Sequence, residues 1–338
     1  MKPSVAILIV HKDGEKILDN CLKSLETTLY NNYGIHLLLN GTKDKSKKIA
    51  EKYDCKVYTS EKNLGFARGT NYLLENVDTE YVVLLNNDVE VDKNWLSELI
   101  TLAEEKEASV VQPKILSLRE PDKFEYAGAA GGYIDTYGYP FCRGRLFSTI
   151  ETDKDQYNSP VQLFWASGAC MLIKRDILKK VGQLDKLFYM YGEEIDLCWR
   201  INLIGGTVWY APQSKIYHIG SYTIKKTNFS KTKEYLIHRN TLLMFLKNTQ
   251  SSTIAKRIVP RILLELISAI FFPTKLLPSI RALIWILKHK KIIESRRKEI
   301  EKIRKKSDKQ LENLIHKRSV ALDYFLLNRK TFKQLWKK

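Results

Sequence analysis

The apolar run at positions 81–85, Tyr-Val-Val-Leu-Leu, ends abruptly at Asn86, Asn87 and Asp88. An unbroken apolar strand of this length is typical of a parallel sheet that helices cover on both faces. In such sheets, ligands bind outside the carboxyl ends of the strands. Because Asn-Asp pairs also form ordinary turns, the run alone favours a simple turn. Other motifs are needed before it indicates a site for a metal-bound phosphate ligand.

Strand-like and helix-like patterns alternate through the first 112 residues. We expect strands at 4–10, 35–39, 55–58, 81–85 and 109–112, with helices at 16–25, 44–53, 66–74 and 95–104. This order predicts an α/β fold with a mainly parallel central sheet, right-handed crossovers and flanking helices.

The middle of the chain is less regular. Residues 118–159 are rich in glycine and aromatic residues and are expected to form long loops near a site. Order returns with a strand pair within 163–173, helices at 175–181 and within 189–203, and strands at 208–210 and 216–218.

Beyond about residue 251 the pattern becomes one of helical stripes. One stripe is apolar and another is charged: Ile254, Ile258, Ile262, Leu266 and Ile270, against Arg257, Arg261 and Glu265. The prolines near 271–273 and 276–278 break the run before a second apolar segment at 280–287. No stretch of 18 residues is apolar and uncharged, so a transmembrane helix is not expected. Two alternatives remain, an interfacial amphipathic helix with Phe271, Phe272 and Trp285 on its apolar side, or a helical cap packed on the preceding domain.

The net charge of +18 is concentrated at the C-terminal end. Residues 288–338 contain 18 Lys and Arg against 6 Asp and Glu, a net charge of +12. Such a tail suits nucleic acid, an anionic membrane surface or a solvated helical face. The hydrophobic content of 44% excludes a disordered chain. The five cysteines show no metal or disulfide spacing and are expected to be free thiols in a reducing cytosol. The first apolar run is too short for a signal peptide.

Four short clusters carry chemistry. They are Asn63–Asn71 (N-L-G-F-A-R-G-T-N), Asn86–Asp88, Tyr191–Arg200 (Y-G-E-E-I-D-L-C-W-R) and Tyr217–His218. The first places glycines at a helix N-terminus, where backbone amides favour anions. The third places acids in a first helical turn, where the helix dipole stabilises carboxylates. Each cluster taken alone has an ordinary structural explanation.

In order and spacing, these clusters resemble the family 2 inverting glycosyltransferases of the GT-A fold, in particular the branch with rhamnosyltransferases of cell-surface glycan assembly. The resemblance covers about residues 4–245 and also includes N-G-T-K-D at 40–44 and S-G-A-C at 167–170. It implies a GT-A catalytic domain at 1–250, with a nucleotide-binding half at 1–115 and an acceptor and catalytic half at 116–250. Residues 251–338 would form a basic, amphipathic helical extension.

The resemblance also assigns a metal site and a catalytic base. Asp88 matches the last position of the family's D-x-D motif, and His218 matches a late histidine that completes the metal site in several members. Carboxylate, imidazole and phosphate ligands suit Mn²⁺ or Mg²⁺. Asn86 stands where many members have Asp. Glu193 and Glu194 match the family's acidic pair, whose second member is the base, so Glu194 is the expected base.

Binding residues are implied in the same way. Donor-binding residues would be His11, Asp13, Leu39, Asn40, Asn63, Gly65, Phe66, Arg68, Asn71, Asn86 and Asn87. Acceptor-binding residues would be Trp165, Ser167, Gly168, Asp196 and Arg200, although the last two could instead brace the helix and loops. Two departures put the donor nucleotide in doubt. Leu39 replaces the family's base-binding Asp, and His11-Lys12-Asp13 replaces a more usual Asn/Thr-Tyr-Asn run.

The sequence therefore predicts inverting, metal-dependent transfer of a sugar, rhamnose being one candidate, from a nucleotide-sugar donor to a lipid-linked or oligosaccharide acceptor. We expect a cytoplasmic protein held peripherally on the anionic inner face of the cell membrane, with no nucleic-acid partner. Two other classes stay open. Leu39 and Asn86 suggest a catalytically silent scaffold, and the tail with net charge +12 suggests a nucleic-acid-binding protein.

Overall fold

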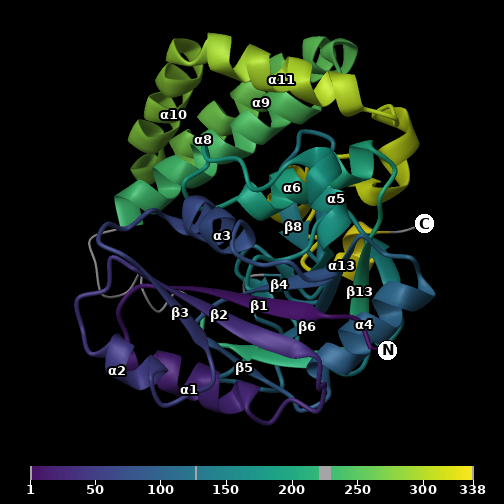
Figure 1. Cartoon of the computed structure of the whole chain (residues 1–338). Helices are drawn as coiled ribbons and strands as arrows, with labels where there is room; N and C mark the ends of the chain where they lie inside the picture. The colour runs from purple at the N-terminus through teal and green to yellow at the C-terminus, as the bar shows by residue number, and fades with distance from the viewer. Residues whose placement is uncertain (1, 126–127, 221–229, 337–338) are drawn as a thin grey trace.

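The computed structural model describes residues 2–125, 128–220 and 230–336, apart from the side chains of 230–231 and 269–271. A large central sheet is covered by helices on both faces, and a layer of long helices lies beyond one of them (Figure 1). The predicted α/β class, with a central sheet flanked by helices, is confirmed.

The central sheet has the strand order β11-β13-β6-β12-β4-β1-β2-β3, and β5 pairs with β13. Strands β4, β1, β2 and β3 are parallel, whereas β12 runs antiparallel to both of its neighbours. The strands are β1 (Val5–His11), β2 (Tyr33–Asn40), β3 (Lys56–Ser60), β4 (Tyr81–Leu85), β5 (Val89–Val91), β6 (Val110–Ser117), β11 (Val161–Leu163), β12 (Cys170–Lys174) and β13 (Val208–His218).

Both faces of this sheet are buried, which explains the unbroken apolar runs. Along β1, alternate side chains enter two separate cores, with Val5 and Ile7 on one side and Ala6 and Leu8 on the other. The flanking helices are α1 (Glu15–Leu25), α2 (Ser46–Ala50), α3 (Phe66–Leu74), α4 (Trp95–Glu105), α5 (Arg175–Val181) and α6 (Glu193–Leu203).

Two of the strand predictions were wrong. The segments 208–210 and 216–218 belong to one strand, β13, which is interrupted by an irregularity between Ala211 and Lys215. The strands within 163–173 do not pair with each other, because β11 pairs with β13 while β12 lies between β4 and β6. β11 and β12 are close in the sequence but occupy separate positions in the sheet. Spacing along the sequence does not reveal which strands pair.

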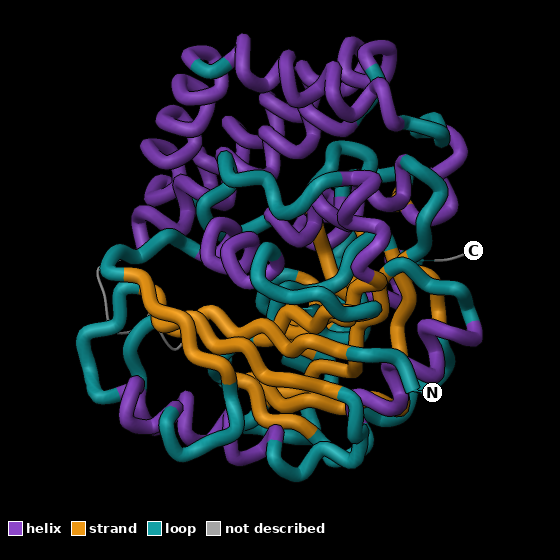
Figure 2. The backbone as a smooth tube through the Cα atoms, in the orientation of Figure 1, coloured by secondary structure: helices purple, strands orange, loops and turns teal. Residues whose placement is uncertain are grey.

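A second, five-stranded sheet has the order β10-β9-β8-β7-β14, where loops were predicted (Figure 2). Its members are short: β7 (Gly132–Asp135), β8 (Pro140–Cys142), β9 (Arg145–Leu146), β10 (Thr149–Ile150) and β14 (Ile315–His316). Strand β14 comes from the C-terminal region and pairs with β7. Strands of two to four residues show no periodicity, so only the long-range pairing reveals them.

The remaining C-terminal elements form the outer helical layer and its connections. They are α8 (Ser230–Asn248), α9 (Ser251–Phe271), η1 (Pro273–Lys275), α10 (Leu276–Lys288), α11 (Lys290–Ile303), η2 (Lys309–Leu314), α12 (Val320–Phe325) and α13 (Phe332–Leu335). Pro278 does not break α10, since it lies in the first turn, where a missing amide hydrogen costs little. Among the helices of the described residues, none combines the length and the apolar character needed to cross a bilayer.

Candidate active site

Asp88 and His218, the two predicted metal ligands, meet at the carboxyl ends of β4 and β13. Oδ1 of Asp88 lies 2.9 Å from Nε2 of His218, and the amide of Asn86 lies 3.4 Å from the same nitrogen. On the other side of the ring, Nδ1 of His218 lies 3.1 Å from Oε2 of the buried Glu125. Glu125 was missed in the sequence, because nothing in its spacing marks it. The contacts of His218 with Asp88, 130 residues away, and with Glu125, 93 residues away, bring the three side chains together.

The donor set at this place fits a divalent cation. Burial by itself would lower the pKa of His218, but Asp88 and Glu125 outweigh it and raise the pKa to about 10 in the protein without metal. A cation at Nε2 would therefore have to displace this proton, because only a neutral imidazole ligates a metal. A carboxylate that orients the far nitrogen of a histidine is a common arrangement around metal ligands. In the described residues no three His, Cys, Asp or Glu side chains form a complete metal cage. Asp88 and His218 would therefore hold Mn²⁺ or Mg²⁺ together with ligand oxygens, such as those of a diphosphate.

A hydrogen-bonded chain joins Asn87 to the loops after β1 and β2. The amide of Asn87 lies 2.7 Å from Nδ1 of His11, whose Nε2 lies 2.8 Å from the hydroxyl of Ser46. Ser46 in turn donates to Asp44, which also accepts the amide hydrogen of Gly14. Burial lowers the pKa of His11 to about 4, so its ring is neutral at pH 7. His11 therefore holds Asn87, and with it the Asn86–Asp88 cluster, in a fixed position.

The loop before α3 is locked onto the segment before α6. Asn40 donates to Asn63 and accepts from the amide of Leu64, which sets the path of the loop. Gly65 has φ +79, and a Cβ there would lie 2.6 Å from the ring of Tyr189. Only glycine meets both demands. The loop that carries the predicted donor residues Asn63 and Gly65 therefore packs against Tyr189, in the segment that leads into Glu193 and Glu194.

Glu193 and Glu194 begin α6 after Gly192, which has a left-handed conformation. Burial raises the pKa of Glu194, while its carboxylate accepts the amide hydrogen of Gly192 at 3.0 Å. Burial and repulsion by Glu194 raise the pKa of Glu193 well above its usual range, and its Oε2 is buried without a hydrogen-bond partner. A Cβ on Gly168 would be 3.7 Å from Glu194 and 3.6 Å from Phe66. Glu194 thus lies beside the predicted acceptor turn, and that turn also adjoins Phe66 of the donor loop.

The turn that presents the acidic pair is strained and clamped. Tyr189 (φ 62) and Tyr191 (φ 70) hold left-handed conformations that bulky residues rarely adopt. From α8, the amide of Asn240 donates to the carbonyls of Met190 at 2.8 Å and Tyr191 at 2.6 Å. The neighbouring Arg239 donates to the carbonyl of Phe188 at 2.8 Å. No sequence pattern marks this clamp, because an asparagine within a helical segment is unremarkable until its partners are known.

Replacing Asn240 by alanine is expected to lower turnover about tenfold and the free energy of unfolding by about 1–3 kcal/mol, since several buried carbonyls lose their donor. The matched control is Thr241→Val, which changes the next residue but not the clamp. A melting curve and a comparison of kcat with donor KM check this. A variant that loses stability but keeps kcat would show that the clamp does not position the acids.

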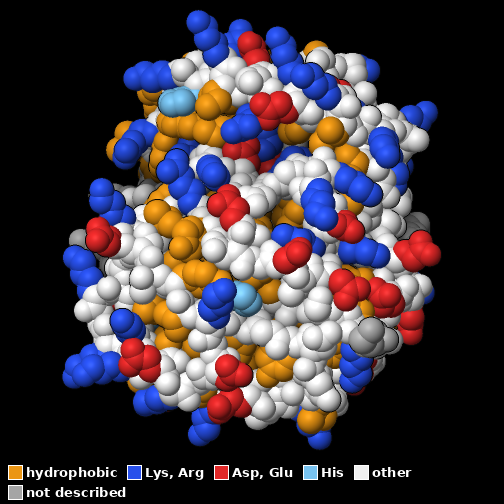
Figure 3. Space-filling view, in the orientation of Figure 1, with side chains coloured by type: hydrophobic (Ala, Val, Ile, Leu, Met, Phe, Trp, Pro, Cys, Tyr) orange, Lys and Arg blue, Asp and Glu red, His pale blue; other side chains and the backbone are white. Residues whose placement is uncertain are grey.

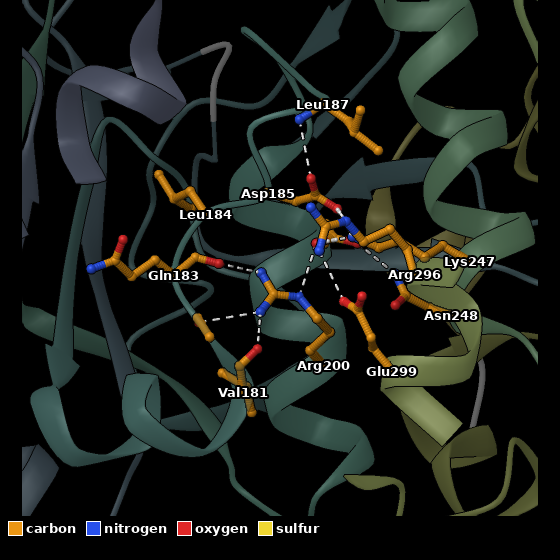
Figure 4. Close-up of polar contacts among 12 residues, drawn as sticks. Val181, Gln183, Leu184, Asp185, Leu187, Arg200, Lys247, Asn248, Arg296 and Glu299 are labelled. Carbon is orange, nitrogen blue, oxygen red and sulfur yellow. Dashed lines mark hydrogen bonds and ion pairs between the residues drawn. The ribbon is translucent and has the colours of Figure 1, made fainter. Parts of the chain in front are cut away.

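Asp196 and Arg200, predicted as acceptor-binding residues, are buried in a charge network. Figure 4 shows Arg200 with Lys247 and Asn248 of the same network. Asp196 accepts from Nε of Arg200 at 3.0 Å, Lys247 at 2.8 Å and Asn248 at 2.8 Å. Arg200 also donates to the carbonyls of Val181, Gly182 and Gln183. Three hydrogen bonds within the protein engage both oxygens of this fully buried carboxylate, which favours the bracing role. The network ties α6 to α8.

Other predicted site residues divide into two groups. Trp165 is buried and donates to the carbonyl of Tyr133, while Asn71 exchanges two hydrogen bonds with the backbone of Leu184. These contacts favour packing roles. Near the site are the buried Ser167 and the half-buried Gly168, Phe66 and Asp13, the last accepting the amide hydrogen of Lys43. Leu39 belongs to the apolar core and Arg68 is exposed on α3.

Comparison with known proteins supports the interpretation of these motifs. The family model described as glycosyl transferase family 2 matches residues 4–182, just over half of the chain. A mannosyltransferase from Pyrobaculum calidifontis, solved with GDP-Man and Mn²⁺, has a similar fold, with a TM-score of 0.54 at 10% identity. The match covers 85% of this chain and 76% of that one.

Curated relatives act on glycans. The low-salt glycan biosynthesis hexosyltransferase of Haloferax volcanii is 31% identical over 147 residues, which are 41% of this chain and 43% of the relative. This chain thus spans less than half of that relative. A rhamnosyltransferase of Escherichia coli K12 is 23% identical over 80% of this chain and 100% of its own. The N-acetylglucosaminyl-diphospho-decaprenol L-rhamnosyltransferase of Mycobacterium tuberculosis is 23% identical over 69% and 81%. The chain belongs to glycosyltransferase family 2, a family of sugar transferases.

Proposed function

We propose that this protein transfers a sugar, with inversion, from a nucleotide-sugar donor to a lipid-linked glycan acceptor, with rhamnose as the first candidate sugar. The observation that carries the proposal is a convergence built from three contacts. Asp88 contacts His218, the backbone amide of Asn86 donates to the carbonyl of Ala169, and the adjacent Gly168 lies beside both Glu194 and Phe66 of the donor loop. Two relatives are named rhamnosyltransferases, and one of these names specifies a diphospho-decaprenol acceptor. A silent scaffold would not need a strained, clamped acidic turn beside this convergence.

In the proposed reaction, Glu194 removes the proton from the attacking acceptor hydroxyl. The C–O bond to the acceptor forms as the bond to the nucleoside diphosphate breaks, so the anomeric configuration inverts. Asn87 and His11 hold the Asn86–Asp88 cluster in place, and Gly168 leaves space beside the base. A Mn²⁺ or Mg²⁺ ion bound by Asp88 and His218 would supply neutralisation of the departing diphosphate. Because Leu39 is apolar and buried, we propose that polar groups elsewhere recognise the donor base.

The raised pKa of Glu194 predicts an acid limb in the rate profile. The base acts only when deprotonated, so kcat/KM should fall as the pH drops through a pKa above the usual glutamate value of about 4.3. Measuring kcat/KM between about pH 4.5 and 8 checks this. A profile that stays flat to the acid end would remove Glu194 from the role of base.

We also propose that the protein works at the anionic inner face of the cell membrane, where a lipid-linked acceptor is presented. This explains a basic C-terminal region without invoking nucleic acid, for which the chain shows no recognised docking module. The test is transfer from UDP-, dTDP- and GDP-sugars to polyprenyl-diphospho-sugar acceptors, with Mn²⁺ or chelator present. Metal-dependent product with one donor class supports the proposal. No product with any donor, together with a salt-sensitive gel shift on nucleic acid, would favour the nucleic-acid-binding alternative.

A further inference from the structure

Helix α9 is packed with its polar side inward. Arg261 is fully buried, with its guanidinium 4.2 Å from the ring centre of Tyr139, and the buried Glu265 lies 2.6 Å from Nδ1 of His238. The opposite side is apolar and exposed, with Val259 at 61% and Leu263 at 52% of full exposure. Helices that face water show the reverse pattern. The predicted charged stripe is therefore mostly the inner face of α9.

Helix α10 continues this outward apolar surface. Its buried side chains, Pro278, Ser279, Ala282 and Ile286, repeat at helical spacing and mark its inner face. Its exposed apolar side chains are Leu276, Leu277, Ile280, Ile284 and Leu287, of which Leu287 reaches 74% exposure. Trp285 was predicted to belong to this surface, but it stacks on His289 at 4.0 Å and lies under Arg239. The predicted Phe271 side chain lies outside the described residues.

The apolar surface extends past the turn between the two helices. The ring of Phe272, which is 41% exposed, lies 6.0 Å from that of Phe325, and Phe325 lies 4.9 Å from Phe147. Leu326 and Leu327 are exposed directly beyond Phe325. An exposed apolar surface of this extent is rare on monomeric soluble proteins and marks an interaction site.

The charges around this surface have one sign. Residues 251–291 contain 8 Lys and Arg and a single acid, Glu265, which is buried. In Figure 3, Lys and Arg side chains border the apolar side chains over α10 at the upper left. Lys275 also lies 4.7 Å from the ring centre of Phe272. Apolar side chains pointing outward between cations match the layered chemistry of a membrane, with anionic headgroups above hydrocarbon.

We infer that the outward face of α9, η1 and α10 docks on an anionic lipid bilayer, with Leu263, Leu277 and Leu287 entering the acyl boundary. The inference deepens the proposed function, because a lipid-linked acceptor would be met at that surface. Nucleic acid explains the cations but not the exposed leucines, since phosphate contacts need no apolar insertion. A protein partner of this chain would need an equally large apolar patch with acidic borders.

Flotation or co-sedimentation of the full chain with vesicles of phosphatidylcholine and phosphatidylglycerol tests the docking face. Binding should require phosphatidylglycerol and weaken with salt. The triple variant Leu263→Gln, Leu277→Gln and Leu287→Gln should bind at least about tenfold more weakly, since it removes apolar insertion. All three side chains are exposed, so the fold should survive. Leu29→Gln, an exposed leucine near α1, is the matched control.

A charge variant separates electrostatics from insertion. Changing Lys288, Lys290 and Lys291 to Gln should weaken vesicle binding on the order of a hundredfold, because each cation near an anionic surface contributes about fivefold. Changing Lys16, Lys23 and Lys52 to Gln, exposed lysines near α1 and α2, should leave binding unchanged.

Donor binding measured on the same proteins keeps the two proposals distinct. A chain that binds a nucleotide sugar but ignores phosphatidylglycerol vesicles would overturn the docking face and leave the transferase proposal standing. Vesicle binding without binding of any nucleotide sugar would support the docking face and contradict the transferase proposal. Vesicle binding that the leucine triple variant leaves intact would place docking elsewhere. If the intact chain dimerises in solution and this variant is monomeric, the face is an interface between copies and the membrane inference is wrong.

Discussion

Replacing Glu194 by glutamine is expected to lower kcat at least about a hundredfold while donor affinity stays within about twofold. The substitution keeps the shape of the side chain and removes only the proton acceptor. General base catalysis contributes about 10²–10⁴-fold, which sets the size of the effect. Steady-state transfer rates together with donor titration measure both quantities.

Glu193→Gln is the matched control for the Glu194 variant. Burial and repulsion by Glu194 raise the pKa of Glu193 well above its usual range, which favours the neutral carboxyl, and an amide mimics a neutral carboxyl closely. We therefore expect a much milder loss of turnover. A larger loss in Glu193→Gln than in Glu194→Gln would move the base to Glu193.

Replacing Asp88 by alanine is expected to abolish transfer and metal-dependent donor binding. It removes the only carboxylate of the Asn86–Asp88 cluster and leaves Glu125 as the one carboxylate that contacts His218 among the described residues. Because the pair Asp88–His218 is the proposed protein contribution to the metal site, no other described ligand replaces it. Donor titration with increasing Mn²⁺ gives the loss of metal response.

Glu90→Gln is the control for the Asp88 variant, since Glu90 lies two residues away and its carboxylate accepts a hydrogen bond from Asn20 rather than contacting His218. It should retain full metal response. Full activity of Asp88→Ala at saturating Mn²⁺ would contradict the assignment of Asp88 as a metal ligand.

The parts of the fold that the sequence predicted well are those in which local pattern and burial agree. Strand β4 and helix α3 begin and end where expected, because a strand buried on both faces and a helix after a glycine loop carry their own boundaries. The pairing of Asp88 with His218 was also anticipated, but only through the family resemblance. Nothing in their separation of 130 residues shows it.

What the sequence missed depends on contacts made after folding. Arg261 and Glu265 look like a solvent-facing stripe until Tyr139 and His238 turn that stripe inward. Strand β14 exists because β7 offers a free edge, and two residues alone carry no strand signal. Glu125 and Asn240 act through partners far along the chain, on His218 and on the backbone before Glu193. Secondary-structure propensity and hydrophobic periodicity depend on residues that are close in the sequence. They therefore cannot predict contacts between residues that are far apart along the chain.

Calorimetric titration of the nucleotide-sugar donor, with and without Mn²⁺, tests the central claim most directly when run on three proteins. The natural chain should bind the donor tightly only with Mn²⁺, Glu194→Gln should match it, and Asp88→Ala should show no metal-dependent binding. That pattern would show that Asp88 serves metal-dependent donor binding, whereas Glu194 serves catalysis and not donor binding. Equal binding by all three proteins, or binding that ignores Mn²⁺, would contradict a metal-dependent donor site at Asp88 and His218.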